Sequence, residues 1–313
     1  MSLAFEYLDP EKIIGSEDFF FVERFLKATG RTQIGWHYII DLTWIYRRFK
    51  DRPPGLCVLD AGGGIGPAQF LLAELGHNVT NADLVHRSPA RWQRRRYGMT
   101  ITILPSYEST SYVEHLKKFG GDGLYARLKW IAARYPWINS LRSPQATARH
   151  VAWRQSAGLA ERPIGHIELV SGNLAAMPEV ESNRFNAVVS LSALEHIPAE
   201  SLQPAIVELK RLLSPEAIWA ITTSGTERRE TWWHAPSQGH CFCESDLEDM
   251  FCAAPRTQKE SPNEILDLYR KNSYLRKNLA QFYKKSGNNG MPWGEWNPLY
   301  VPCGIYEIPS RVD

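Results

Sequence analysis

A glycine-rich string close to residue 60 constrains the fold more than any other feature of this chain. Residues 56–60 have the sequence LCVLD, and residues 61–66 continue at once with AGGGIG. A short apolar run bounded by glycine predicts a buried strand, and glycine lets the backbone turn sharply and approach a ligand closely. Pro67 suits a first helical turn and Gly76 a helix end. We therefore expect a strand, a tight turn, and a helix whose N-terminus faces a ligand.

The same alternation continues along the chain. Residues 77–84 (HNVTNADL) form a second expected strand that ends at Asp83, and residues 199–213 have apolar side chains at helical spacing. Further strands are expected at residues 167–173, 186–192 and 217–224, with a closing edge strand at residues 300–308. Strands that alternate with helices predict an α/β fold with a doubly wound, mostly parallel sheet.

The remaining segments suggest how the chain is organised. Residues 1–52 are expected to form an N-terminal helical cap, because Ser16 suits a helix start and Gly30 a helix end. Residues 53–313 are expected to form the α/β domain. It carries a helical insertion at about residues 86–165, which is too long for one crossover, and a helical and aromatic elaboration at about residues 225–299.

Composition excludes several classes of protein. The chain is 43% hydrophobic and 22% charged, which is ordinary for a globular protein and excludes a disordered tail or a coiled coil. No apolar run reaches the roughly 18 to 20 residues that cross a bilayer, so no membrane insertion is expected. Five scattered cysteines do not suggest a disulfide framework, and a cytoplasmic location is the expectation.

The net charge of +2 conceals an uneven distribution. Between His86 and Gly165 there are 14 lysines and arginines against four acidic residues, which gives this segment a charge of +10. Two interpretations remain open. The segment forms a solvated basic face that pairs with the acidic remainder of the chain, or it forms the rim of a pocket for an anionic substrate, with Arg91 and Arg95 as ligands.

The spacing of the glycine string indicates which cofactor it serves. Starting at Asp60, the pattern is D-x-G-x-G-x-G. A dinucleotide fingerprint fits poorly, because Pro67 would stand where its third glycine belongs. The string instead resembles motif I of the class I S-adenosylmethionine-dependent methyltransferases. In that family an acid at the end of the second strand binds both ribose hydroxyls, and Asp83 matches it.

The resemblance continues in order over about residues 56–224, apart from the insertion. Residues 171–174 (SGNL) match the turn that binds the adenine amine, with Asn173 in place of an acid; residues 190–197 (SLSALEHI) match the segment that lines the methionine end. The resemblance implies a methyltransferase with a Rossmann-like, seven-stranded type of sheet and S-adenosylmethionine as cofactor. It also implies a set of cofactor-binding residues: Asp60, Gly62, Gly63, Gly64, Gly66, Asp83, Leu84, Asn173, Leu174, Ser190 and Leu191.

Methyl transfer to a hydroxyl requires a positioned acceptor and a base, and histidine is the natural base near neutral pH. The candidates are His196, just beyond the fourth expected strand, and His234 and His240, beyond the fifth. Trp233 is a candidate substrate contact. The alternatives are that His196 orders its loop through Glu195, and that His234 and His240 only pack and hydrogen-bond in an aromatic loop.

A metal site is not expected. His234, His240, Cys241, Cys243 and Cys252 lie within 19 residues, but their spacing lacks the paired C-x₂-C units of a zinc site. The sequence also shows no convincing trio of acids for magnesium.

The sequence does not identify the methyl acceptor, and three hypotheses compete. The first is O-methylation of a small molecule, such as a saccharide or an anionic sugar phosphate; residues 35–38 and 232–242 resemble methyltransferases of cell-surface polysaccharide pathways. The second is an RNA methyltransferase that uses the arginine cluster, although the chain has no separate RNA-binding module. The third is a relative that binds the cofactor without turnover.

Overall fold

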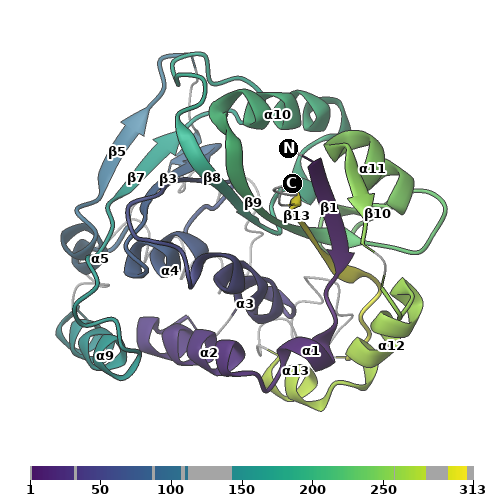
Figure 1. The fold of residues 1–313 in the computed structure, drawn as a ribbon, viewed down its shortest axis with the longest axis horizontal. Helices are drawn as coiled ribbons and strands as arrows, with labels where there is room; N and C mark the ends of the chain where they lie inside the picture. Colours follow the sequence, from purple (N-terminus) through teal and green to yellow (C-terminus); the bar gives the residue numbers. More distant parts are fainter. Residues whose placement is uncertain are drawn as a thin grey trace, which may run out of the picture.

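The computed structural model of the chain describes residues 2–31, 34–86, 89–106, 110–111, 143–256, 258–279 and 295–308. Within these residues the core is one nine-stranded sheet (Figure 1). In spatial order its strands are β12 (Ala253–Pro255), β1 (Ser2–Tyr7), β13 (Val301–Ile308), β9 (Leu213–Gly225), β8 (Phe185–Leu191), β2 (Cys57–Ala61), β3 (Asn78–Asp83), β7 (Ile167–Ser171) and β5 (Thr100–Ile103).

The pairing directions confirm the expected doubly wound, mostly parallel α/β sheet. Strands β9, β8, β2, β3, β7 and β5 pair in parallel with one another. Strand β13 runs antiparallel to both β9 and β1, and β12 is parallel to β1. The carboxyl ends of the parallel strands therefore meet at one edge of the sheet, which is where open α/β sheets bind ligands.

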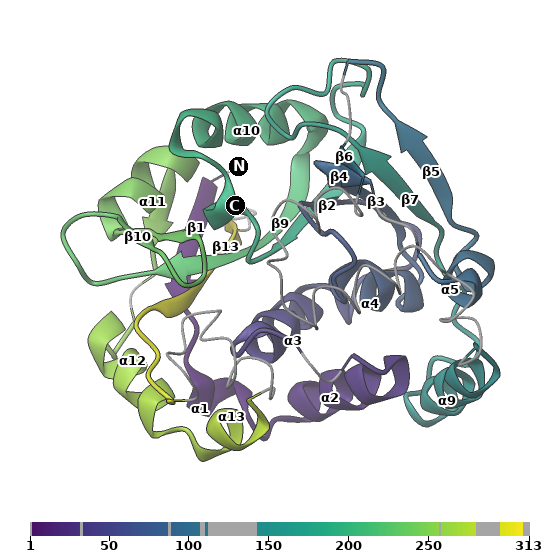
Figure 2. The same ribbon diagram turned by 180° about the vertical axis from the view of Figure 1, so that it is seen from behind.

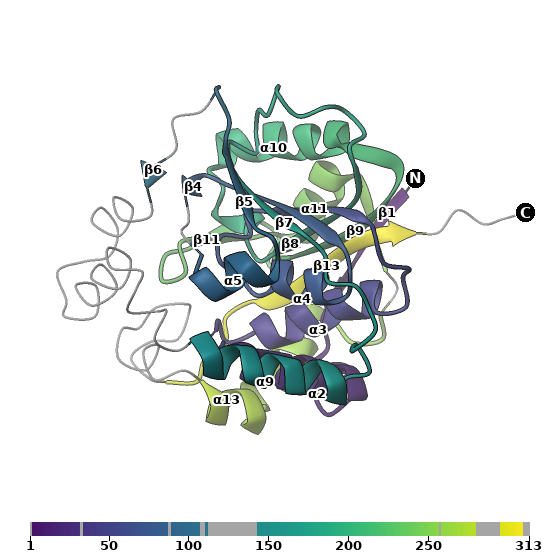
Figure 3. The same cartoon turned by 90° about the vertical axis from the view of Figure 1, so that its left-hand side faces the viewer.

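Helices cover both faces of the sheet, as Figures 1 and 2 show from opposite sides. On one face lie α3 (Tyr38–Phe49) and α4 (Ala68–Glu74), and outside them lie α2 (Glu17–Thr29) and α9 (Ser143–Ser156), which run side by side (Figure 3). On the other face lie α10 (Ala199–Leu212) and α11 (Glu244–Phe251). The smaller elements are α1 (Pro10–Ile13), β4 (Val85–His86), α5 (Arg91–Arg96), β6 (Thr110–Ser111), the 3₁₀ turn η1 (Leu194–His196), β10 (Trp232–His234), β11 (Gly239–Cys241), α12 (Pro262–Lys271) and α13 (Ser273–Asn278).

Helix α2 illustrates how local signals define the elements. The Ser16 hydroxyl accepts a hydrogen bond from the Phe19 amide, and Gly30 ends the helix in the left-handed conformation at φ +69°. Both caps are those that the sequence predicts. The apolar stripe buries Val22 and Phe25 completely, so α2 is held by packing rather than by propensity alone.

The N-terminal and C-terminal strands correct two expectations. Residues 1–52 do not form a purely helical cap, because Ser2–Tyr7 form a strand inside the sheet; likewise β13 is not an edge strand, because β1 covers it. Pro302 is tolerated because β1 pairing ends at Tyr7 opposite Cys303, and beyond it the Pro302 carbonyl accepts from the Leu8 amide. Proline has no N–H, and at this position an N–H would face β1 beyond its last paired residue. The ladder therefore loses no hydrogen bond at Pro302.

The predicted insertion is also partly sheet. Residues 100–103 form β5, which pairs with β7, while residues 107–109 and 112–142 lie outside the described part of the chain. The C-terminal elaboration contributes β12 to the opposite edge of the sheet. Both additions pair with segments far away in sequence, so local patterns carry little signal for them. In the described part, no helix is long and apolar enough to cross a membrane.

A buried ion network anchors the basic segment to the core. The Glu74 carboxylate, with no solvent exposure, accepts from Arg96 Nε at 2.6 Å and Arg154 Nη1 at 2.7 Å, and it lies 3.0 Å from His150 Nε2. Burial alone would raise the pKa of Glu74, but hydrogen bonds from His150 and Arg96 hold it well below its usual value. These two arginines therefore pair with an acid of the core and do not form part of a solvated basic face.

Candidate cofactor and acceptor site

The glycine string forms a turn that side chains could not occupy. Gly62 and Gly64 have φ values of +74° and +52°, in the left-handed region that favours glycine. A Cβ atom on Gly63 would lie 2.1 Å from Asp60 Oδ2, and one on Gly66 would lie 2.8 Å from the Gly63 carbonyl oxygen. The loop therefore presents bare backbone at the carboxyl end of β2, ahead of α4.

The Asp60 carboxyl group lies buried beneath this loop. Its Oδ2 atom is 3.4 Å from Asn81 Nδ2, whereas its Oδ1 atom has no hydrogen-bond partner among the described residues. Burial, reinforced by the charge of Asp83, raises the pKa of Asp60 to about 7. Asn81 and Gln69 also donate to the Gly64 carbonyl, at 3.1 Å each, and so fix the shape of the turn.

Two further predicted contacts lie at the ends of β3 and β7. The Gly172 amide donates to the Asp83 carbonyl at 3.0 Å and ties the two strand ends together. Asp83 is partly exposed, and the adjacent Leu84 side chain is 46% exposed. The Asn173 side-chain oxygen accepts from the Ala175 amide at 3.0 Å. One lone pair of this oxygen therefore stabilises the turn, and the other remains for the adenine that Asn173 is expected to bind.

The segment after β8 closes the site on the other side of the loop. The Ser190 hydroxyl donates to the Ala61 carbonyl at 3.0 Å. Ala193 and Leu174 pack against the loop, because a Cβ on Gly62 would lie 2.8 Å from Ala193 Cβ and 4.0 Å from Leu174 Cδ1. Leu191 is buried as well. The predicted cofactor residues thus come from the ends of four adjacent strands, β8, β2, β3 and β7.

A small pocket lies beyond this loop, between the start of α3, the segment after β8, the end of β9 and the residue before β13. Its polar lining consists chiefly of His37, Ser192, Glu195, His196, Ser237 and Tyr300. Trp36 forms one wall and packs its ring edge-on against Trp296 and Tyr269. The pocket therefore combines titratable groups with a rigid aromatic boundary.

The three histidines predicted from the sequence occupy different positions. His196 is exposed and lines the pocket; its Nδ1 atom lies 2.8 Å from the Gln238 carbonyl oxygen. Because a carbonyl can only accept, Nδ1 carries the proton and Nε2 keeps a free lone pair. His234 is buried, and burial lowers its pKa. Its Nδ1 atom lies 2.7 Å from Ser237 Oγ, and Nε2 has no partner among the described residues.

His240 lies in the β10–β11 hairpin and packs between Trp233 and Phe242, with ring centroids 4.9 and 5.9 Å away. Burial lowers the pKa of His240, and the charge of nearby His196 adds to that effect. Trp233 is 49% exposed on the same hairpin. Neither side chain is part of the pocket lining.

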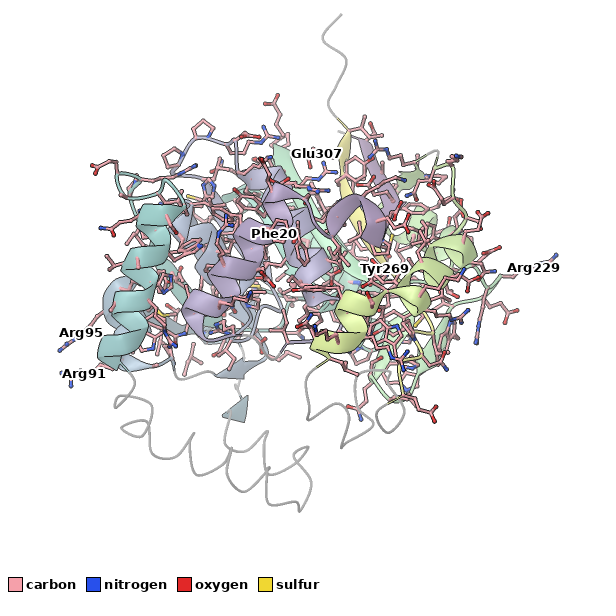
Figure 4. The ribbon with its side chains drawn as sticks, turned by 90° about the horizontal axis from the view of Figure 1, so that it is seen from below. Phe20, Arg91, Arg95, Arg229, Tyr269 and Glu307 are labelled. Carbon is pink, nitrogen blue, oxygen red and sulfur yellow. The ribbon has the colours of Figure 1, made fainter. Side chains whose placement is uncertain are left out.

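The predicted arginine contacts lie elsewhere. Arg91 and Arg95 are exposed on α5, and Figure 4 shows both side chains extending outward at one end of the molecule. Neither lines the pocket. In the described part of the chain, no group of three or more histidine, cysteine, aspartate or glutamate side chains is arranged to hold a metal ion.

Asp41 and Tyr300 escaped the sequence interpretation, whereas His37 and Glu195 lie in segments that it quoted without giving either residue a part in proton transfer. His37 Nδ1 lies 2.7 Å from Asp41 Oδ2, and both side chains are buried. Their spacing of four residues on a helix was a usable signal. Glu195 is buried, and burial raises its pKa. Tyr300 comes from a distant segment and carries no local signal.

The fold and this site define the class of S-adenosylmethionine-dependent methyltransferases: an open parallel sheet, a glycine turn after one strand and an acid at the end of the next. The profile of a methyltransferase-domain family matches residues 37–254, and the chain belongs to that family. It is an enzyme of the class I type, and S-adenosylmethionine is its cofactor. No curated protein sequence matches the chain.

Solved structures with a similar fold include three methyltransferases. The 1,6-didemethyltoxoflavin-N1-methyltransferase of Burkholderia thailandensis is 14% identical, with 85% of this chain and 75% of that chain covered and a TM-score of 0.41. A putative sarcosine dimethylglycine methyltransferase from Galdieria sulphuraria is 13% identical, with 93% and 98% covered and a TM-score of 0.42. A TehB-like methyltransferase from Corynebacterium glutamicum is 14% identical, with 78% and 91% covered and a TM-score of 0.35.

The residues at the strand ends fit this cofactor. The glycine turn leaves a cradle that a Cβ atom would fill, and the Asp60 Oδ1 atom, which no described residue pairs with, lies beneath it. A buried carboxyl suits a ligand that carries positive charge, as an amino group and a sulfonium do. When bound, the cofactor supplies an electrophilic methyl group on sulfur.

Proposed function

We propose that this enzyme methylates a hydroxyl group of a small, uncharged molecule, of saccharide or polyol type, and that this hydroxyl enters the pocket lined by His37, His196 and Tyr300. The observation that carries this proposal is the make-up of the pocket. Among the residues that the structure describes, its lining offers imidazoles and hydroxyls, with one carboxyl and no lysine or arginine. Such groups suit a neutral hydroxyl compound better than the sugar phosphate suggested by the overall charge pattern.

The proposed roles follow from position. Residues of the glycine turn together with Asp60, Asp83, Asn173 and Leu174 hold the cofactor, and the segment from Ser190 onward borders both the cofactor loop and the acceptor pocket. Trp36 and its aromatic neighbours keep water from the floor of the pocket. The acceptor hydroxyl must lose its proton as it reacts, and an imidazole in the lining accepts it.

Among the histidines that the sequence singles out, His196 is the best placed to contact the acceptor. It lines the pocket with a fixed tautomer and a free Nε2 lone pair. His234 and His240 stand behind this lining, and we assign them to the support of the hairpin through Ser237 and Trp233. Arg91 and Arg95 are not assigned to acceptor binding.

The proposal is tested in two stages. Calorimetry with the purified chain should show binding of S-adenosylmethionine and S-adenosylhomocysteine but not of NAD. A panel of neutral sugars, polyols and phenols, with matched phosphorylated and amino compounds, is then screened for formation of S-adenosylhomocysteine, and products are located by mass spectrometry and NMR. A methyl group on oxygen of a neutral compound is the expected product. Turnover confined to amines, to phosphorylated compounds or to RNA would refute the proposal.

A further inference from the structure

A chain of hydrogen bonds runs along the floor of the pocket through side chains that the sequence did not bring together. Trp36 Nε1 donates to the Tyr300 hydroxyl at 3.1 Å, and this hydroxyl lies 3.4 Å from His37 Nε2. On its other side, His37 Nδ1 lies 2.7 Å from Asp41 Oδ2. Trp36, His37, Asp41 and Tyr300 are all buried, with at most 5% of each exposed.

The positions of the protons follow from what each group can donate. A carboxylate oxygen only accepts, so His37 carries its proton on Nδ1 and has a lone pair on Nε2. The indole of Trp36 only donates, so the Tyr300 oxygen accepts from it and directs its own proton to His37. Burial raises the pKa of Tyr300 well above its usual value, so this hydroxyl is protonated at neutral pH. One oxygen lone pair of Tyr300 remains for a ligand in the pocket.

Asp41 is held in place from a second element. Its Oδ2 atom also accepts from the Ser192 hydroxyl at 2.9 Å. Ser192 has φ +46°, a left-handed conformation that is costly for a residue other than glycine and that the surrounding structure must hold in place. The strained residue lies where the segment after β8 meets the glycine turn. The carboxylate is thus positioned from both α3 and the cofactor edge of the sheet.

The two pocket histidines differ in the group that faces their Nδ1 atoms. A protonated His37 would form an ion pair with Asp41, in a buried setting where such attraction is strong. The Nδ1 partner of His196 is a neutral carbonyl, and the ring is exposed. The Tyr300 hydroxyl and the ring of Tyr38 also face His37, and the Glu195 carboxyl lies near it.

We propose that the acceptor's proton ends on His37 and travels there through the Tyr300 hydroxyl, with Asp41 and Ser192 positioning the imidazole. The inference rests on the proposed function. The acceptor oxygen forms its bond to the methyl carbon as the carbon–sulfur bond breaks and its electron pair stays on sulfur. The acceptor's proton passes to Tyr300 Oη, and the proton of Tyr300 passes to His37 Nε2. The positive charge lost at sulfur reappears on an imidazolium paired with Asp41.

The first experiment needs no acceptor. Nitrogen NMR of the full chain with isotope-labelled histidine, saturated with S-adenosylhomocysteine, reports which ring nitrogen of His37 carries the proton, and His37→Gln assigns the signal. We expect the Nδ1–H tautomer with a strongly deshielded proton, and a changed signal in Asp41→Asn. A tautomer protonated on Nε2 would overturn the inference, whatever the acceptor proves to be.

The second experiment uses the compound returned by the screen. Tyr300→Phe removes one oxygen and keeps the ring, and His37→Gln removes the proton acceptor. Each should lower kcat by about 100-fold, in the range of general-base contributions, while KM and the affinity for S-adenosylhomocysteine stay within about threefold. His166→Gln is the matched control, because His166 is exposed and its side chain contacts Thr100 at the far edge of the sheet.

The outcomes separate this inference from the proposed function. If the screen finds an O-methylated product but Tyr300→Phe retains full kcat, the relay is wrong and the function stands. If His196→Gln abolishes turnover while both relay variants remain active, His196 is the base. A His37→Gln chain that fails to fold leaves Tyr300→Phe and the tautomer measurement to decide.

Discussion

Asp60 gives the most direct quantitative test of the site, because its carboxyl is buried without full hydrogen bonding. The pKa of Asp60 rises from 3.8 to about 7, a shift of about 3 units, and each unit corresponds to about 1.4 kcal/mol. In the unfolded chain the group ionises above about pH 4, whereas in the folded chain it keeps its proton until about pH 7. The folded state therefore binds the extra proton in this interval, and stability falls as pH rises through it.

The substitution Asp60→Asn removes this dependence and keeps the size of the side chain. We expect the difference in unfolding free energy between variant and wild type to grow in favour of the variant by about 4 kcal/mol at most between pH 4 and pH 8, and to stay constant above pH 8. The measurement is equilibrium urea unfolding of the cofactor-free protein at several pH values. Taking the difference at each pH cancels the contribution of all other titrating groups.

One control variant and one binding measurement accompany this test. The control is Glu168→Gln in β7, which removes a partly exposed carboxyl that pairs with Arg184. Its unfolding free energy should differ from that of the wild type by a small amount. S-adenosylmethionine should bind Asp60→Asn more weakly than it binds the wild type, since the variant lacks the carboxylate beneath the loop. A stability difference that does not change with pH would show that Asp60 ionises normally and would refute the account of a desolvated carboxyl.

Three further predictions concern the loop, the ion network and the surface arginines. Gly63→Ala should abolish cofactor binding in calorimetry, because the new Cβ would lie 2.1 Å from Asp60 Oδ2. Glu74→Gln should cost about 3 to 5 kcal/mol in urea unfolding at pH 7, because it leaves the buried Arg154 and the half-buried Arg96 without their carboxylate; the penalty should shrink in strong acid, where the wild-type carboxyl also becomes neutral. Arg91→Ala combined with Arg95→Ala should leave kcat/KM for a neutral acceptor within about twofold, since both side chains extend outward from the molecule and neither lines the pocket, and a large loss would restore the hypothesis of an anionic acceptor.

How far the sequence predicts the fold depends on the range of the interactions. Helix α2 and the strand–turn–helix around Gly63 could be predicted because their signals are local: a serine cap, a left-handed glycine, and a steric requirement for bare backbone. Strand β1 was missed because it is stabilised by pairing with β13, about 300 residues away, and by no cap or turn of its own. The same non-local pairing explains why β13 was wrongly expected at the edge.

The cofactor residues could be predicted from the sequence and the acceptor pocket could not, again because of the range of the interactions. A parallel sheet brings the residue after each strand to one edge, so Gly62, Asp83 and Asn173 could be assigned to one ligand from their order in the chain. The acceptor pocket has no such rule, because His37, Ser192 and Tyr300 come from a helix start, a strand end and a loop. Their chemistry depends on which atoms face one another across those elements. The cofactor half follows from topology, whereas the proton path can be argued only from the distances that join the three segments.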